Sequence, residues 1–145
     1  MAKIEASVVI DRPVEEVWNF ITDLSKTPKW DTPVSEVKLT STGPLGVGST
    51  GEMKAMRTTI SIRVTEYEPN RRLSFEHTSG PMKGGIDTFS VEAIDGKTKL
   101  TEGGSYKLSG FYRLLGLFIS SSRMRRGVEV TLNNAKRMLE TEAPS

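Results

Sequence analysis

Apolar residues occupy every second position near the start of the chain, from Ile4 to Ile10, while positions 3, 5 and 7 are polar. This period of two is typical of a strand with one buried face. Pro13 ends the strand and suits the first turn of a helix, where its missing N–H leaves no hydrogen bond unmade. Apolar residues then recur at helical spacing from Val14 to Ile21. The pattern predicts a strand, a short amphipathic helix and a second short helical turn near Trp30.

The pattern changes between Val34 and Leu108, where short runs of residues are separated by turn signals rich in Gly and Pro. The pair Asp95-Gly96 is the strongest of these signals, because Asp-Gly between alternating apolar runs favours a two-residue hairpin turn. Strands joined by such short connections pair with their chain neighbours and need no crossover helix. We therefore expect a meander of about six antiparallel strands here.

The helical period returns after Gly110 and runs to about Glu140, with Leu132, Ala135 and Leu139 on one face. The serines at 120–122 weaken helix propensity, so the regular helix is expected to begin near Ser120.

The order of elements, β-α-α-β6-α, predicts an α+β helix-grip fold, in which a curved antiparallel sheet of about seven strands wraps around a long C-terminal helix. A sheet with one apolar face must cover that face, and one long amphipathic helix is sufficient to do so. Where the curvature of the sheet exceeds what the helix side chains fill, a cavity remains between sheet and helix.

The composition narrows the possible chemistry. The chain has 145 residues, which suits a single domain over residues 1–145. It has no Cys, which excludes disulfides, thiol nucleophiles and thiolate metal sites. It has one His, His77, too few for a multi-His metal site. We expect neither a metal nor a cofactor.

The N-terminal residues lack the basic-then-apolar pattern of a signal peptide. No apolar run approaches the ~20 residues that a membrane-spanning helix needs. The sequence therefore predicts a soluble, cytoplasmic protein.

The total charge is nearly balanced, with 20 basic against 18 acidic residues and a net charge of +2, which argues against a nucleic-acid partner. Residues 111–140 nevertheless carry a local charge of +4, so the remaining residues sum to −2. This segment could dock on an acidic membrane surface or an acidic carrier protein, or it could be an ordinary solvated helix face. Its basic residues are Arg113, Arg123, Arg125, Arg126, Lys136 and Arg137.

Three stretches carry a resemblance to a known family: Ser7–Trp18, followed by Asp23-Leu24 and Pro28–Trp30; Val64–Phe75; and Gly110–Phe118 with the helix after it. They resemble the polyketide cyclase/dehydrase and lipid-transport family of the START-like superfamily, also called SRPBCC, which includes the birch-pollen-allergen fold. The resemblance implies a START-like ligand-binding domain. The superfamily includes lipid binders, cyclases and co-chaperones, so the fold leaves the function open. The iron ligands of its oxygenase members are absent, because one His cannot supply them.

Strand parity places polar side chains on the face that would line the cavity. If Phe75 faces the cavity, His77 does too, and Asp87 shares a side with Phe89. Glu102 and Tyr106 lie on one side of the next strand. His77, Asp87, Glu102 and Tyr106 are therefore candidates for acid/base catalysis. In the alternative interpretation they are solvated strand ends, or a bulge reverses the parity.

The function predicted from the sequence is binding of a small hydrophobic or amphipathic molecule, such as a lipid, fatty-acyl or polyketide-type compound, between the sheet and the C-terminal helix. One alternative is a metal-free polyketide cyclase or dehydratase that uses the polar residues. Another is a protein-interaction module with a collapsed cavity. Residues 111–119 are expected either to gate the cavity or to pack beneath the sheet. The predicted ligand-binding residues are Phe75, His77, Phe89, Val91, Leu100, Tyr106, Phe118, Ser122 and Leu132.

Overall fold

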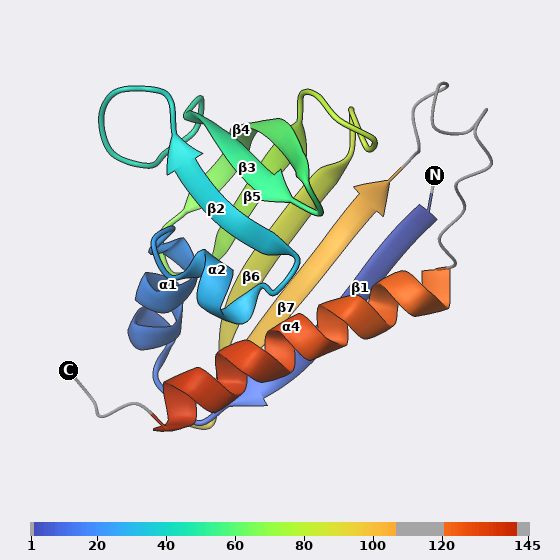
Figure 1. The fold of residues 1–145 in the computed structure, drawn as a ribbon. Coiled ribbons are helices and arrows are strands. Elements are labelled where there is room, and N and C mark those ends of the chain that lie inside the picture. The colour runs from blue at the N-terminus through green and yellow to red at the C-terminus, as the bar shows by residue number, and fades with distance from the viewer. Residues whose placement is uncertain (1, 107–120, 142–145) are drawn as a thin grey trace.

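The computed structural model describes residues 2–106 and 121–141 (Figure 1). The described elements follow the predicted order, and the two short helices come directly after the first strand. They are β1 (Ala2–Ile10), α1 (Val14–Thr22), α2 (Thr27–Trp30), β2 (Val34–Leu39), β3 (Thr50–Ala55), β4 (Thr58–Glu68), β5 (Arg72–His77), β6 (Ile86–Ile94), β7 (Lys97–Tyr106) and α4 (Ser121–Thr141).

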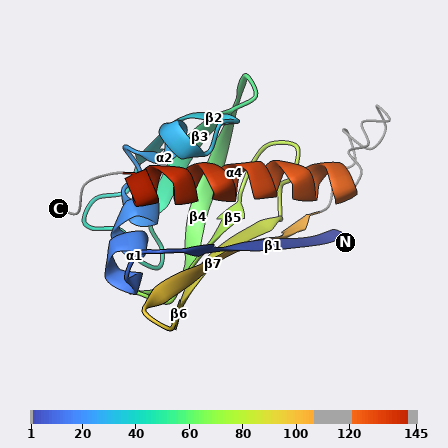
Figure 2. The same ribbon diagram turned by 90° about the horizontal axis from the view of Figure 1, so that it is seen from below.

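The strands form one seven-stranded sheet in the order β1-β7-β6-β5-β4-β3-β2, and every neighbouring pair is antiparallel. Strands β2 to β7 form a meander in which each strand pairs with the next, and β1 adds to the edge of the meander at β7. Helix α4 crosses the sheet on the side of β1 and β7, α2 packs against β2, and α1 contacts β6 and β7 (Figures 1 and 2). The predicted helix-grip fold is confirmed.

The β6–β7 hairpin turns through two residues with positive φ, Asp95 at 48° and Gly96 at 80°, as the Asp-Gly pair predicts. The register of β5, β6 and β7 continues without a shift, so every second residue keeps to one face of the sheet. A bulge lies in the neighbouring pair of β4 and β5, at Val64 and Glu66. It does not change which residues of β5, β6 and β7 share a face of the sheet.

The β3–β4 turn is strained, because Met56 and Arg57 have φ values of 49° and 66° without being glycine or asparagine. Asn and Gly adopt this conformation at much lower cost. We expect the double variant Met56→Asn/Arg57→Gly to raise the free energy of unfolding by about 1–2 kcal/mol in urea denaturation. Lys83→Gly is a control at an exposed turn position outside this φ region, where added glycine should not stabilise. Equal or lower stability of the double variant would contradict the strain argument.

In the hydrophobic core, the inner face of α4 packs with residues of β1 and α1. Leu132, Ala135 and Leu139 belong to one buried cluster with Ile10 and Val17. Because these residues recur at i, i+3 and i+7, one face of α4 covers the sheet.

Within the described residues, no helix is long and apolar enough to cross a membrane.

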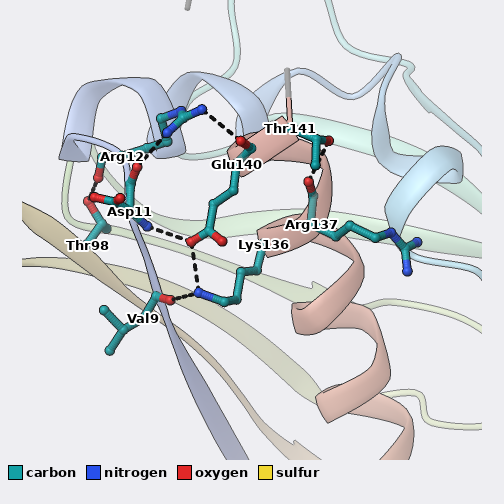
Figure 3. Close-up of polar contacts among 8 residues, drawn as sticks. All are labelled: Val9, Asp11, Arg12, Thr98, Lys136, Arg137, Glu140 and Thr141. Atoms are coloured by element: carbon teal, nitrogen blue, oxygen red, sulfur yellow. Dashed lines mark hydrogen bonds and ion pairs between the residues drawn. The ribbon is translucent and has the colours of Figure 1, made fainter. Parts of the chain in front are cut away.

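The C-terminal end of α4 is tied to the end of β1 by a polar network, which we call the α4 anchor (Figure 3). The Glu140 Oε2 atom accepts hydrogen bonds from the Asp11 backbone N–H and from Lys136 Nζ, both at 2.8 Å. Lys136 Nζ also donates to the carbonyl of Val9 at 2.7 Å, and Arg12 Nη2 donates to the carbonyl of Glu140 at 3.0 Å. These hydrogen bonds hold the pKa of the Glu140 carboxyl below its usual value.

Candidate functional site

A narrow apolar pocket, with a cavity volume of about 60 Å³, lies between the curved sheet and the segment that runs from α1 to β3. Asp31 is the one charged residue among the described residues that line it. The lining is formed by Ile21, Leu24, Thr27, Trp30, Asp31, Val37, Leu39, Leu45, Ser49, Thr50, Gly51, Met53, Ile62, Val64, Leu73, Phe75 and Phe89.

The position of this pocket corrects the sequence-based expectation, which placed the cavity between the sheet and the C-terminal helix. No described residue of α4 lines the apolar pocket. The reason is that Leu132, Ala135 and Leu139 pack directly into the core and fill the space under the helix. The pocket instead occupies the other half of the curved sheet, where α2, β2 and β3 fold over β4 to β6 (Figure 1). A separate, polar groove runs between β1 and α4.

Aromatic rings form the inner wall of the apolar pocket. Trp30 is 1% exposed and meets Phe89 edge to face, with ring centroids 5.8 Å apart. Phe75 stacks beside Phe89 at 6.4 Å. Trp30 is held in place by α4, because Asn134 Nδ2 donates a hydrogen bond to its carbonyl at 3.2 Å. The last turn of α2 therefore positions one wall of the pocket.

Next to this wall, three predicted candidate residues on successive strands form a hydrogen-bonded chain. His77 Nε2 on β5 lies 2.7 Å from Asp87 Oδ2 on β6, and the Tyr106 hydroxyl on β7 donates to Asp87 Oδ1. His77 is 4% exposed and stacks on Phe75, with ring centroids 6.2 Å apart. The polar chain is thus continuous with the aromatic wall of the pocket.

Two glycines make room for the Tyr106 ring. A Cβ atom on Gly104 would collide with the ring of Tyr106, which folds back over this position on the same strand. A Cβ on Gly85 would lie 3.3 Å from Tyr106 Cδ1 and 2.9 Å from the carbonyl oxygen of Met82. The absence of side chains at these positions lets the tyrosine hydroxyl reach Asp87.

Two further carboxyl groups complete what we call the polar cluster: His77, Asp87, Glu102, Tyr106 and Asp31. Burial, followed by the nearby charges of Asp31 and Asp87, raises the pKa of Glu102 well above its usual value. Burial, followed by Asp87, raises the pKa of Asp31 to about 6. Burial and the negative charge of Asp87 also raise the pKa of the Tyr106 hydroxyl. Burial therefore favours the uncharged forms of Glu102, Asp31 and Tyr106.

Asp31 is the member of the polar cluster that sequence reasoning missed. It ends α2, and its backbone N–H donates to the carbonyl of Thr27 at 2.9 Å. The available signal was its place directly after Trp30, because an aromatic that anchors a short helix in the core brings its neighbour inward. Local periodicity does not reveal this, since it does not show where the helix packs on the sheet.

Several buried polar atoms near the pocket lack a hydrogen-bond partner among the described residues. They are Trp30 Nε1, His77 Nδ1 and Glu102 Oε2. Buried polar groups are normally satisfied, so each of these atoms can bind a further polar group. In residues 2–106 and 121–141, no three His, Cys, Asp or Glu side chains are arranged to hold a metal ion.

The other residues predicted to bind ligand lie in different surroundings. Phe75 and Phe89 line the apolar pocket. Val91, Leu100 and Leu132 are buried in the core, and Leu132 also borders the polar groove. Ser122 is exposed near the start of α4. Phe118 and the predicted gate over residues 111–119 lie outside the described residues.

The basic residues of α4 do not form a single free surface. Lys136 is bound within the α4 anchor. Arg125 Nε lies 3.4 Å from Glu129 Oε1, one helical turn away. Arg123 and Arg126 are exposed, and Arg113 lies outside the described residues. Docking of this segment on an acidic partner stays a prediction.

A family model described as polyketide cyclase / dehydrase and lipid transport matches residues 1–140. The Aha1 dimer structure from Colwellia psychrerythraea is 20% identical, with a TM-score of 0.70 over 97% of this chain and 98% of that chain. A protein from Nitrosospira multiformis is 16% identical, with a TM-score of 0.74 over 97% of both chains. DynU16, from the dynemicin biosynthetic locus, is 21% identical, with a TM-score of 0.70 over 96% of this chain and 47% of that chain. No curated protein sequence matches. The structural likenesses show a shared fold.

Proposed function

Because the chain belongs to the polyketide cyclase/dehydrase and lipid-transport family, we propose that it binds a small hydrophobic or amphipathic molecule, of a lipid, fatty-acyl or polyketide type, in the apolar pocket. The observation that carries this proposal is the pocket itself, an almost wholly apolar lining next to a confined polar cluster. Ligand sites commonly combine apolar walls with a few placed polar groups in this way.

The binding energy would come chiefly from apolar surface that the ligand and the pocket remove from water, at about 25 cal/mol per Å². The aromatic wall of Trp30, Phe75 and Phe89 offers flat surfaces that pack against rings or chains. The polar cluster at the edge of this wall would orient the ligand.

The proposal is tested by titrating the protein with N-phenyl-1-naphthylamine, an uncharged dye that fluoresces in apolar surroundings. We expect saturable binding, and at least tenfold weaker binding by Leu39→Trp, because Leu39 lines the pocket and the added ring would fill it. Val47→Trp adds the same bulk on a loop at a position that is 69% exposed, and serves as the matched control with unchanged affinity. Unsaturable binding, or equal binding by both variants, would refute the proposal.

A second candidate function is a metal-free cyclase or dehydratase. The observation that favours it is the His77–Asp87–Tyr106 chain, because an acid, a base and a hydroxyl lie within hydrogen-bonding reach beside the pocket. If the protein is a dehydratase, ligands recovered from wild type and from Asp87→Asn by mass spectrometry should differ by one water. Identical ligands from both proteins would contradict the dehydratase and leave binding as the only proposed function.

A further inference from the structure

The unpartnered polar atoms near the pocket include both hydrogen-bond donors and acceptors. Trp30 lines the pocket, and its indole Nε1 can only donate a hydrogen bond. Glu102 Oε2 belongs to a carboxyl whose protonated form is favoured, and a protonated carboxyl both donates and accepts. His77 Nε2 is already engaged with Asp87, which leaves Nδ1 without a partner among the described residues. These atoms belong to side chains within or beside the aromatic wall.

Glu102 is directly connected to the pocket through the sheet register. It stands opposite Phe89, which lines the pocket, in the β6–β7 pair. Directly opposed residues of an antiparallel pair point to the same face, with their side chains in contact range. Asp31 lines the pocket, and its charge contributes to the raised pKa of Glu102. The two carboxyls therefore lie near each other.

The described residues that line the pocket include no Lys or Arg that would balance an anion. The influences that raise the pKa of Asp31 and of Glu102 are burial and other carboxyl groups. An ionised carboxylate on the ligand would lose its hydration and would also face Asp87.

A ligand cation has one carboxylate in the described lining to pair with, Asp31, because a pKa of about 6 leaves it ionised at pH 7.5. Asp87 is less available. The two oxygens of Asp87 already accept hydrogen bonds from His77 and Tyr106. A buried ion pair repays the desolvation of both charges only when further hydrogen bonds complete the geometry. An uncharged oxygen, in contrast, needs only a donor or acceptor that is already buried and unpartnered.

We propose that the polar cluster selects apolar ligands whose polar group is an uncharged hydroxyl or carbonyl oxygen, held by Glu102 and Trp30, and that it rejects ligands ending in a carboxylate. This inference rests on the proposed binding function and specifies which chemistry the pocket accepts. The oxygen accepts a hydrogen bond from the Trp30 indole or the Glu102 carboxyl, and a ligand hydroxyl also donates one.

The test compares 1-decanol and decanoate, which share one chain and differ in charge, as competitors of bound N-phenyl-1-naphthylamine at pH 7.5. Decanol should compete with at least tenfold higher affinity than decanoate, because a carboxyl with a pKa near that of free Glu, ~4.3, is ionised at this pH. Decanoate binding as tightly as decanol would overturn the selectivity while leaving the binding function intact. If the dye itself does not bind, the binding function fails instead.

Two substitutions at one position separate hydrogen bonding from packing. Glu102→Met keeps the length of the side chain but removes its hydrogen-bonding atoms, and should weaken decanol binding about fivefold, the worth of one hydrogen bond. Glu102→Gln keeps a donor and should retain most of that affinity. The affinity of the dye reports whether either variant has distorted the pocket. Equal decanol binding by the Met and Gln variants would remove Glu102 from the selectivity.

Discussion

The variant Asp31→Asn is expected to be more stable than wild type at pH 7.5, by about 3 kcal/mol. The reason is that burial and the nearby Asp87 raise the pKa of Asp31 from 3.8 to about 6, and one pKa unit corresponds to about 1.4 kcal/mol. At pH 7.5 the Asp31 carboxyl is ionised in both states, so the folded state bears the cost of a buried charge that the unfolded state does not. Asn keeps the shape of the side chain and carries no such cost.

The pH dependence gives the sign of this effect. Between pH 3.8 and about 6 the unfolded chain binds fewer protons at Asp31 than the folded chain, so wild-type stability falls as the pH rises. The gain from Asp31→Asn should be absent below pH 3.8 and reach its full size above pH 6. Glu102→Gln should shift stability in the same direction, because its carboxyl pKa is also raised.

Urea denaturation at pH 3.5, 5 and 7.5 measures this difference. Asp23→Asn is a control of opposite sign, because the Ser25 hydroxyl lowers the pKa of the exposed Asp23 carboxyl and that bond favours the ionised form. A gain from Asp31→Asn of equal size at pH 3.5 and 7.5 would show that protonation is not its source.

Leu132→Ala is expected to lower the free energy of unfolding by about 2–5 kcal/mol, because it removes a side chain that is 1% exposed from the contact between α4 and the sheet. Val130 is the matched control on the same helix. It is 50% exposed, so Val130→Ala should change stability by less than about 0.5 kcal/mol.

Chemical denaturation of both variants, followed by far-UV circular dichroism, gives the two values. Dye binding by Leu132→Ala, measured well below its unfolding transition, should resemble that of wild type, because Leu132 lies in the core and not on the apolar pocket. A large loss of dye affinity without a loss of stability would place Leu132 in the ligand site.

The sequence carries most of the information that builds the strands around the polar cluster. Strict alternation on β5, β6 and β7, together with the Asp95-Gly96 turn, determines which residues share a face. The register is unbroken there, so counting by twos from Phe75 and Phe89 was sufficient to bring His77 and Asp87 together. The ligand-binding role of these residues stays a prediction.

The location of the pocket could not be read from the sequence, because it depends on packing between distant elements. The apolar face of α4 predicted contact with the sheet but not how completely its side chains would fill the concave surface. The contribution of Asp31 depends on where α2 sits, which is set by the packing of Trp30 against Phe20 and Phe89. Such long-range contacts leave no periodic signal in the chain.

The chain His77–Asp87–Tyr106 is built by three strands that follow one another in the sequence, joined by short connections. Bringing residues together across short loops costs little chain entropy. The pairing of β1 with β7 costs more, because the two strands lie at opposite ends of residues 2–106. We therefore expect the hydrogen-bonded chain to form early in folding, before β1 and α4 dock. Two members of this chain lie on β5 and β6, which do not pair with β1, so substitutions at His77 and Asp87 can alter what the protein recognises without touching the late pairing of β1 with β7.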